Sequence, residues 1–195
     1  MPARTWITDF THLVPLDDTS APLAARRRSD FTREVVEAAT SRKAGPAWQS
    51  AVRCIGRVGR RLCRAYVQVR FDGSDTVEWS CARCGDLGTV STFRNTQSDL
   101  SSFVPRGKVV AWGFDDQERK MLMLGTEWIP ELRAVVARAS PYEEVPGLLL
   151  VSATVPELDA IYTLVEELTD LTRSRQGREV LDGLRFTLST SIDGF

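Results

Sequence analysis

Four cysteines give the strongest chemical signal in this chain. Cys81 and Cys84 form a C-x-x-C pair followed by Gly85, and Cys54 and Cys63 form a wider pair with eight residues between them. Thiolates are good ligands for Zn²⁺, which takes four of them in a tetrahedron. A tight C-x-x-C turn supplies two sulfurs, and a glycine after it tolerates the positive φ of such a turn. The sequence therefore predicts one zinc site formed by Cys54, Cys63, Cys81 and Cys84.

The same thiols have three rival interpretations. A disulfide framework is typical of small secreted domains, whereas this chain has 195 residues and shows no apolar leader. A redox C-x-x-C motif is expected at a helix start, and Cys81 instead lies between two β-like runs. Unliganded thiols are the third alternative. Because all four zinc ligands would come from the protein, the predicted zinc is structural, since closed sites are more often structural than catalytic.

The residues around the cysteines predict the strands that hold them in place. Residues 65–71 alternate between apolar and polar side chains, and residues 76–80 alternate again after a turn at 72–75. Residues 88–93 can return as a third strand. This pattern predicts a zinc-ribbon-like antiparallel β-element at the centre of the chain.

Helices and further strands are predicted on both sides of this element. Residues 22–42 carry apolar side chains at a helical period, with Pro22 in the first turn and Gly45-Pro46 after the end. The segment at 115–124 fits either a helix or a strand. The remaining predictions are strands at 108–112 and 147–153 and helices at 126–139, from 154 onward and at 178–188.

These elements predict an α+β fold with two domains. Domain 1–104 contains the N-terminal helix and the central zinc-ribbon-like antiparallel β-element, and domain 105–195 is a small acidic α+β unit. The boundary is placed at Pro105-Arg106-Gly107, which follows a polar loop.

Charge is distributed unevenly along the chain. The net charge is −1, yet residues 53–94 carry eight basic and four acidic residues, and residues 115–195 carry fifteen acidic and eight basic residues. The basic stretch includes Arg57, Arg60, Arg61 and Arg64. Arginine beside exposed aromatic rings, here Tyr66 and Trp79, is a common way to bind nucleic acid. The rival interpretation, which we favour, packs both rings in the core around zinc and leaves the arginines as solvated charge.

Three arginines at 26–28, on the predicted helix, have a similar pair of interpretations. They could contact phosphate, although three arginines on a helix are more often a solvated face.

The sequence contains no recognisable catalytic motif. It has no Walker loop, no G-x-S-x-G elbow and no deaminase pattern, and its single histidine excludes H-E-x-x-H. That histidine, His12, could act as a base or a fifth metal ligand, but a packed or capping role is favoured. No apolar run is long enough to span a bilayer. We therefore expect a cytoplasmic, non-enzymatic protein that does not enter a membrane.

The chain also resembles a family of uncharacterised bacterial proteins. The resemblance covers most of residues 4–185 and is clearest at 5–12, 36–42 and 78–86 and in the spacing of Cys54 and Cys63. Relatives carry a proline where this chain has Ala82, and a more Gly/Trp-rich segment where it has residues 91–93. The resemblance implies a four-cysteine, zinc-ribbon-like metal site and no established activity.

The predicted function is that of a protein-binding or adaptor module with a structural zinc. The first alternative is a nucleic-acid-binding zinc ribbon that uses the basic face from Arg57 to Arg64. The second alternative is an enzyme that uses His12 with a carboxylate.

Overall fold

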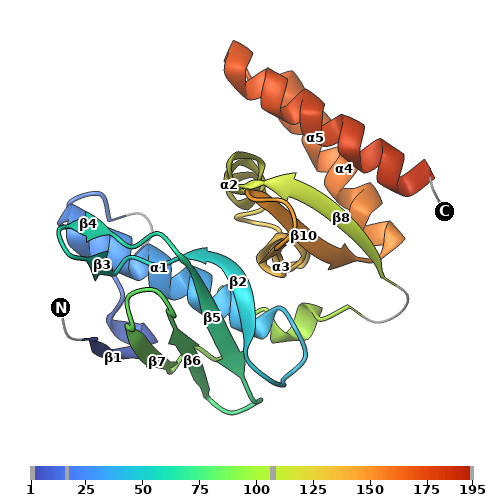
Figure 1. The fold of residues 1–195 in the computed structure, drawn as a ribbon. Coiled ribbons are helices and arrows are strands. Elements are labelled where there is room, and N and C mark those ends of the chain that lie inside the picture. The colour runs from blue at the N-terminus through green and yellow to red at the C-terminus, as the bar shows by residue number, and fades with distance from the viewer. Residues whose placement is uncertain (1–2, 16–17, 106–108, 194–195) are drawn as a thin grey trace. The chain divides into compact units, whose positions relative to one another are not determined.

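The computed structural model of the chain describes residues 3–15, 18–105 and 109–193 (Figure 1). The chain divides into two compact units, Met1–Val104 and Pro105–Phe195, and each has a sheet of its own. The boundary predicted at 105–107 falls mostly on residues outside the described ranges. Both units combine helices with a sheet, so the predicted α+β class is confirmed.

The first unit is built on a five-stranded sheet with the strand order β1-β7-β6-β5-β2. β1 runs parallel to β7, and the other neighbouring strands are antiparallel. The strands β3 and β4 form a separate short hairpin. The elements are β1 (Thr5–Asp9), the 3-10 helix η1 (Phe10–His12), α1 (Leu23–Thr40), β2 (Trp48–Arg53), β3 (Arg57–Val58), β4 (Arg61–Leu62), β5 (Tyr66–Phe71), β6 (Thr76–Ser80), β7 (Leu87–Ser91) and the 3-10 helix η2 (Ser101–Phe103).

The central strands form because their side chains alternate between core and solvent. β5 buries Val67, Val69 and Phe71 and exposes the residues between them, as the two-residue period of a strand requires. The three strands predicted between 65 and 93 are confirmed as β5, β6 and β7. The third strand ends at Ser91, before the predicted end, because Thr92 leaves the extended conformation with a φ of 61°.

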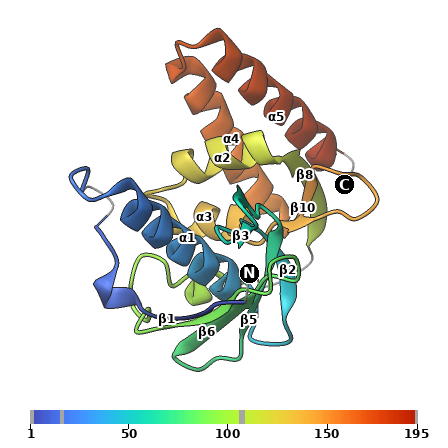
Figure 2. The same ribbon diagram turned by 60° about the vertical axis from the view of Figure 1, so that its left-hand side comes forward.

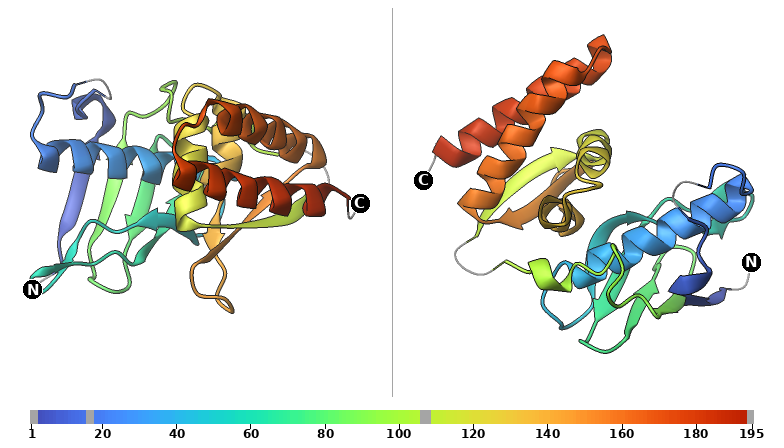
Figure 3. Two further views of the ribbon diagram at one scale, coloured as in Figure 1. Left: turned by 90° about the horizontal axis from the view of Figure 1, so that it is seen from above. Right: turned by 180° about the vertical axis from the view of Figure 1, so that it is seen from behind.

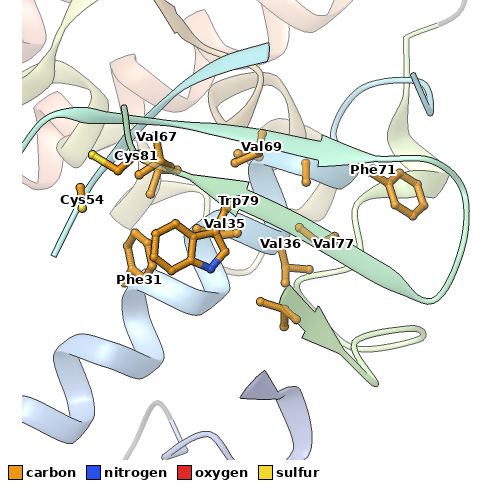
Figure 4. Packing of buried hydrophobic residues seen from close by; sticks show 14 of the residues in the cluster. Phe31, Val35, Val36, Cys54, Val67, Val69, Phe71, Val77, Trp79 and Cys81 are labelled. Carbon is orange, nitrogen blue, oxygen red and sulfur yellow. The ribbon is translucent and has the colours of Figure 1, made fainter. Parts of the chain in front are cut away.

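α1 packs along one face of this sheet (Figures 2 and 3). Its buried face includes Phe31 and Val35, and Figure 4 shows both beside Trp79 of β6. The rings of Phe31 and Trp79 meet edge to face, with centroids 4.9 Å apart. Burial of each large apolar side chain stabilises the fold by about 1.5–3 kcal/mol. The predicted helix is confirmed, and the sheet beneath it is larger than expected because β1 and β2 extend it on both sides.

The parallel edge strand β1 depends on Gly88 in β7. A Cβ atom at this position would lie 2.7 Å from the carbonyl oxygen of Trp6 and 2.7 Å from Nε1 of Trp79. Both distances are shorter than van der Waals contact, so glycine lets the two strands approach.

The second unit has a three-stranded antiparallel sheet with the order β8-β10-β9. α5 packs against α4 and β8, and α3 packs against β10; Figure 3 shows α4 and α5 side by side. Trp112, Phe114 and Leu149 are fully buried in its core. The elements are β8 (Val110–Asp115), α2 (Asp116–Gly125), α3 (Pro130–Ala137), β9 (Ser140–Pro141), β10 (Leu148–Ala153), α4 (Val155–Leu171) and α5 (Arg175–Asp193).

Side-chain caps decide where the helices of this unit begin. The ambiguous segment at 115–124 is helical because Asp115 accepts hydrogen bonds from two N–H groups of the first turn of α2. At α4, the predicted start is confirmed, and Glu157 accepts hydrogen bonds from both the N–H and the hydroxyl of Thr154. α3 begins at Pro130 and not at Thr126, because Thr126 ends α2 by donating to the carbonyl of Leu122.

Candidate metal centre

The four cysteine sulfurs gather at one point of the first unit. All four Sγ atoms lie within 4.8 Å of one another. The Sγ atoms of Cys54 and Cys84 are 3.6 Å apart, and those of Cys63 and Cys81 are also 3.6 Å apart. A tetrahedron of sulfurs around Zn²⁺, with bonds of about 2.3 Å, has edges of about 3.8 Å. The four sulfurs are therefore spaced as ligands of one metal ion.

The same distances argue against disulfides. A disulfide joins two sulfurs at about 2.05 Å, and all four cysteines are free. These two distances of 3.6 Å each join a cysteine of one pair to a cysteine of the other pair. The C-x-x-C pair connects β6 to β7, so it lacks the helix start that a thioredoxin-like redox motif has.

The wider cysteine pair is held by the hairpin β3–β4. Cys54 follows β2 directly, and the N–H of Gly56 donates to its Sγ over 3.2 Å. The chain then turns at Gly59, which has a φ of 62°, and returns to Cys63, whose N–H donates to the carbonyl of Gly56. Eight intervening residues are enough for one minimal hairpin, which brings both sulfurs to the same side.

Gly56 leaves room for the sulfurs. A Cβ atom here would lie 2.9 Å from Sγ of Cys84 and 2.6 Å from Oδ2 of Asp86. The role of Gly56 is therefore steric, since any side chain would enter the ligand cluster.

The C-x-x-C pair forms a tight knuckle between β6 and β7. Gly85 donates its N–H to the carbonyl of Cys81 and adopts a φ of 76°, which confirms the predicted need for glycine. The N–H of Cys81 donates to the carbonyl of Asp86 and so closes the knuckle. Figure 4 shows Cys54 and Cys81 close to Val67, at one end of the core. The knuckle therefore connects the candidate metal centre to both β6 and β7 of the sheet.

Burial and backbone hydrogen bonds act in opposite directions on the thiols. Burial raises the pKa of Cys54, and it also raises the pKa of Cys84. Burial acts in the same direction on Cys81, but hydrogen bonds from the backbone of Cys84 and Arg83 and from the Cys63 side chain outweigh it and lower the pKa. A bound divalent ion requires thiolates and displaces their protons.

An ion pair between the buried Asp86 and the exposed Arg4 fixes the C-x-x-C knuckle to the N-terminal segment. Asp86 is only 2% exposed, and its carboxylate lies 2.7 Å from Nη2 of Arg4 and accepts the Arg4 backbone N–H. Burial raises the pKa of Asp86, but the hydrogen bonds and charge of Arg4 exceed that effect and leave it below its ordinary value. Sequence reasoning missed this pair, because the two residues are distant in the chain.

The predicted basic residues lie on the surface around the hairpin β3–β4. The side chains of Arg57, Arg60, Arg61 and Arg64 are all exposed. Trp79 is buried in the core, as the favoured interpretation predicts. Tyr66 is half-buried, and its ring is covered by the guanidinium of Arg53 at 3.6 Å. Neither ring is presented beside the arginines as a stacking surface.

His12 lines a separate pocket of about 520 Å³ together with Asp9. The Asp9 carboxylate caps η1 by accepting hydrogen bonds from the backbone N–H and the hydroxyl of Thr11. Within the described residues, no hydrogen bond joins His12 to Asp9. His12 and the Asp9 carboxylate therefore share one pocket, without a hydrogen bond between them.

Comparisons with protein-family models, with curated proteins and with solved structures found no match to this chain. No helix among the described residues is both long and apolar enough to cross a membrane.

Proposed function

We propose that Cys54, Cys63, Cys81 and Cys84 bind one structural zinc ion, and that the protein is a non-enzymatic binding module. The observation that carries the proposal is the cluster of four Sγ atoms within 4.8 Å. Four protein ligands fill the coordination sphere of zinc and leave no position for a substrate. The ion would connect the hairpin β3–β4 to the knuckle between β6 and β7.

Metal analysis of protein purified without added zinc tests this assignment. We expect about one equivalent of zinc per chain, and less than about half an equivalent would contradict it. The thiols should react with a thiol reagent only after chelation or denaturation. Disulfides would instead give no reactive thiols under either condition.

The adaptor role of the module is supported by the closed ligand set, since four protein ligands leave a zinc ion no open position for a substrate. Capture of partners from the source cell, with metal-loaded protein as bait and with and without nuclease, tests it. A protein partner that survives nuclease treatment supports the adaptor role, and loss of every partner with nuclease favours nucleic acid.

Nucleic-acid binding through the basic face is the second candidate, favoured by the exposure of Arg57, Arg60, Arg61 and Arg64. Such binding depends on counterion release and weakens steeply with salt. An affinity that does not fall with added salt would exclude it.

A further inference from the structure

Five arginines converge on one pocket of the first unit, beside the candidate metal centre. The pocket has a volume of about 460 Å³, and small-molecule sites commonly measure about 300–1,000 Å³. Among the residues that the structure describes, none that lines this pocket is acidic. Its arginines are Arg27, Arg28, Arg53, Arg57 and Arg64.

These arginines come from three places in the fold. Arg27 and Arg28 lie in the first turns of α1, Arg53 ends β2, and Arg57 and Arg64 belong to the hairpin segment between β2 and β5. Like charges gathered in one pocket repel each other and raise the free energy of the empty protein. An anion with several charges would relieve this repulsion, so the arrangement favours such a ligand.

Part of the pocket is ordered before any ligand arrives. Arg53 stacks on the ring of Tyr66 at 3.6 Å and donates to the Tyr66 hydroxyl over 2.6 Å and to the Arg64 carbonyl over 3.1 Å. The guanidinium of Arg28 lies 4.6 Å from the ring centroid of Trp6. Side chains fixed in this way lose little conformational entropy when they bind a ligand.

We propose that this pocket binds a compact polyphosphate, either the di- or triphosphate group of a nucleotide or a free inorganic polyphosphate. The planar guanidinium fork matches phosphate oxygens in pairs, and several forks around one pocket match several adjoining phosphates. Ile55 and Leu62 add apolar surface to the same pocket, against which a nucleoside can lie.

The structure favours a compact ligand over an extended nucleic acid. Sequence-tolerant binding of single strands uses aromatic rings on which bases stack. Here Trp79 is buried, Tyr66 is covered by Arg53, and the ring of Trp6 has the guanidinium groups of Arg4 and Arg28 over it. Arg60 and Arg61, at the tip of the hairpin, do not line the pocket, so the arginines form a local cluster rather than a continuous track.

Calorimetric titration of the full-length, zinc-loaded protein tests the proposal. The probes are sodium tripolyphosphate, ATP and a short single-stranded DNA, in magnesium-free buffer. We expect tripolyphosphate and ATP to bind the wild type, and R27Q/R57Q to weaken both by at least about tenfold. The matched control R60Q/R61Q removes the same charge outside the pocket and should stay within about twofold of the wild type.

The relative affinities of ATP and tripolyphosphate distinguish the two sources of the ligand. Similar affinities for ATP and tripolyphosphate indicate free polyphosphate, and tighter binding of ATP indicates a nucleotide. The proposal is overturned if neither compound binds at about 1 mM, or if both double variants weaken binding equally. It is also overturned if the DNA binds more tightly than tripolyphosphate and its binding depends on Arg60 and Arg61.

Zinc content and thermal unfolding are measured for every variant before and after titration, because polyphosphates chelate divalent ions. A variant that keeps its zinc and its unfolding transition reports on the pocket alone, so failure of the zinc assignment is detected separately. If R27Q/R57Q does not fold, R27Q alone provides the test, since Arg27 lies on α1 and not in the hairpin.

Discussion

Gly56 shows how one missing side chain shapes the metal centre. A Cβ atom at this position would come within 2.9 Å of a ligand sulfur, Sγ of Cys84, and within 2.6 Å of Oδ2 of Asp86. Both neighbours are fixed by the knuckle and by Arg4. The smallest possible substitution must therefore displace either a metal ligand or a buried carboxylate.

We accordingly predict that G56A weakens zinc binding by at least about tenfold, since changes next to metal ligands typically cost about 10–100-fold in affinity. Competition with a chromophoric chelator measures the change. G45A is the matched control, because the nearest atom to its Cβ, the Lys43 carbonyl oxygen, is 3.8 Å away. Equal zinc affinities for G56A and G45A would show that the ligand cluster relaxes around the added methyl group.

A buried hydroxyl joins the end of α1 to the segment before η2. Thr40 is fully buried, donates to the carbonyl of Val36 over 2.8 Å and accepts the N–H of Leu100 over 3.0 Å. T40V preserves the shape of the side chain but leaves this N–H without an acceptor. We predict that the variant lowers the free energy of unfolding by about 1–3 kcal/mol in urea titration.

T40S is the matched control for this residue, because it keeps the hydroxyl and loses only a methyl group. It should be destabilised less than T40V, and a T40V variant as stable as the wild type would contradict the prediction.

The elements of the first unit differ in how far the sequence could predict them. β5 and β6 were predictable because the alternation of Val67 and Val69 is a local signal. The parallel strand β1 was not predicted, since its position depends on Gly88 and on the pair of Arg4 with Asp86, which are long-range contacts. The arginine pocket was equally hidden, because its residues come from three separate segments.

The four cysteines were predictable as a cluster because zinc sites have recognisable spacing, whereas the shape of their surroundings was not. The sequence predicted a zinc-ribbon-like β-element with Tyr66 and Trp79 packed around zinc. In the structure, α1 and the sheet bury Phe31, Val35, Val69 and Trp79 together. A metal bound by the four cysteines would therefore stabilise mainly the hairpin β3–β4, whose four strand residues are all exposed.

Removal of zinc should unfold this hairpin locally and leave the sheet folded. In hydrogen exchange of chelated protein, we predict that amides from 55 to 64 lose protection, including the Cys63 N–H that bonds to Gly56. Amides of β5 should stay protected, because Val67 and Val69 remain in the core. Loss of protection throughout α1 and β5 would mean that the metal holds the whole unit together.

Opposite charge accumulates in the two halves of the chain. Residues 1–104 carry fifteen basic and eleven acidic residues, and residues 105–195 carry ten basic and fifteen acidic residues. The arginine pocket and the cysteine cluster both belong to the first unit. Anion and metal binding should therefore be properties of that unit alone, and the second unit should contribute to neither.

Each unit also has a buried core. The first has the core between α1 and its sheet, and the second buries Trp112, Phe114 and Leu149 around β8 and β10. Their lengths lie in the usual range of single domains, about 50–250 residues. We predict that fragments 1–104 and 105–195 each unfold cooperatively. Only the first should bind zinc, about one equivalent, since all four cysteines lie within it.

Near-ultraviolet circular dichroism is the readout for this prediction, because each fragment contains a buried tryptophan, Trp79 in the first and Trp112 in the second. A fixed tryptophan signal that is lost in a single thermal transition indicates an independent fold. If fragment 105–195 keeps its helical far-ultraviolet signal but shows no fixed signal from Trp112, its core requires residues of the first unit, and the two units are then one cooperative domain.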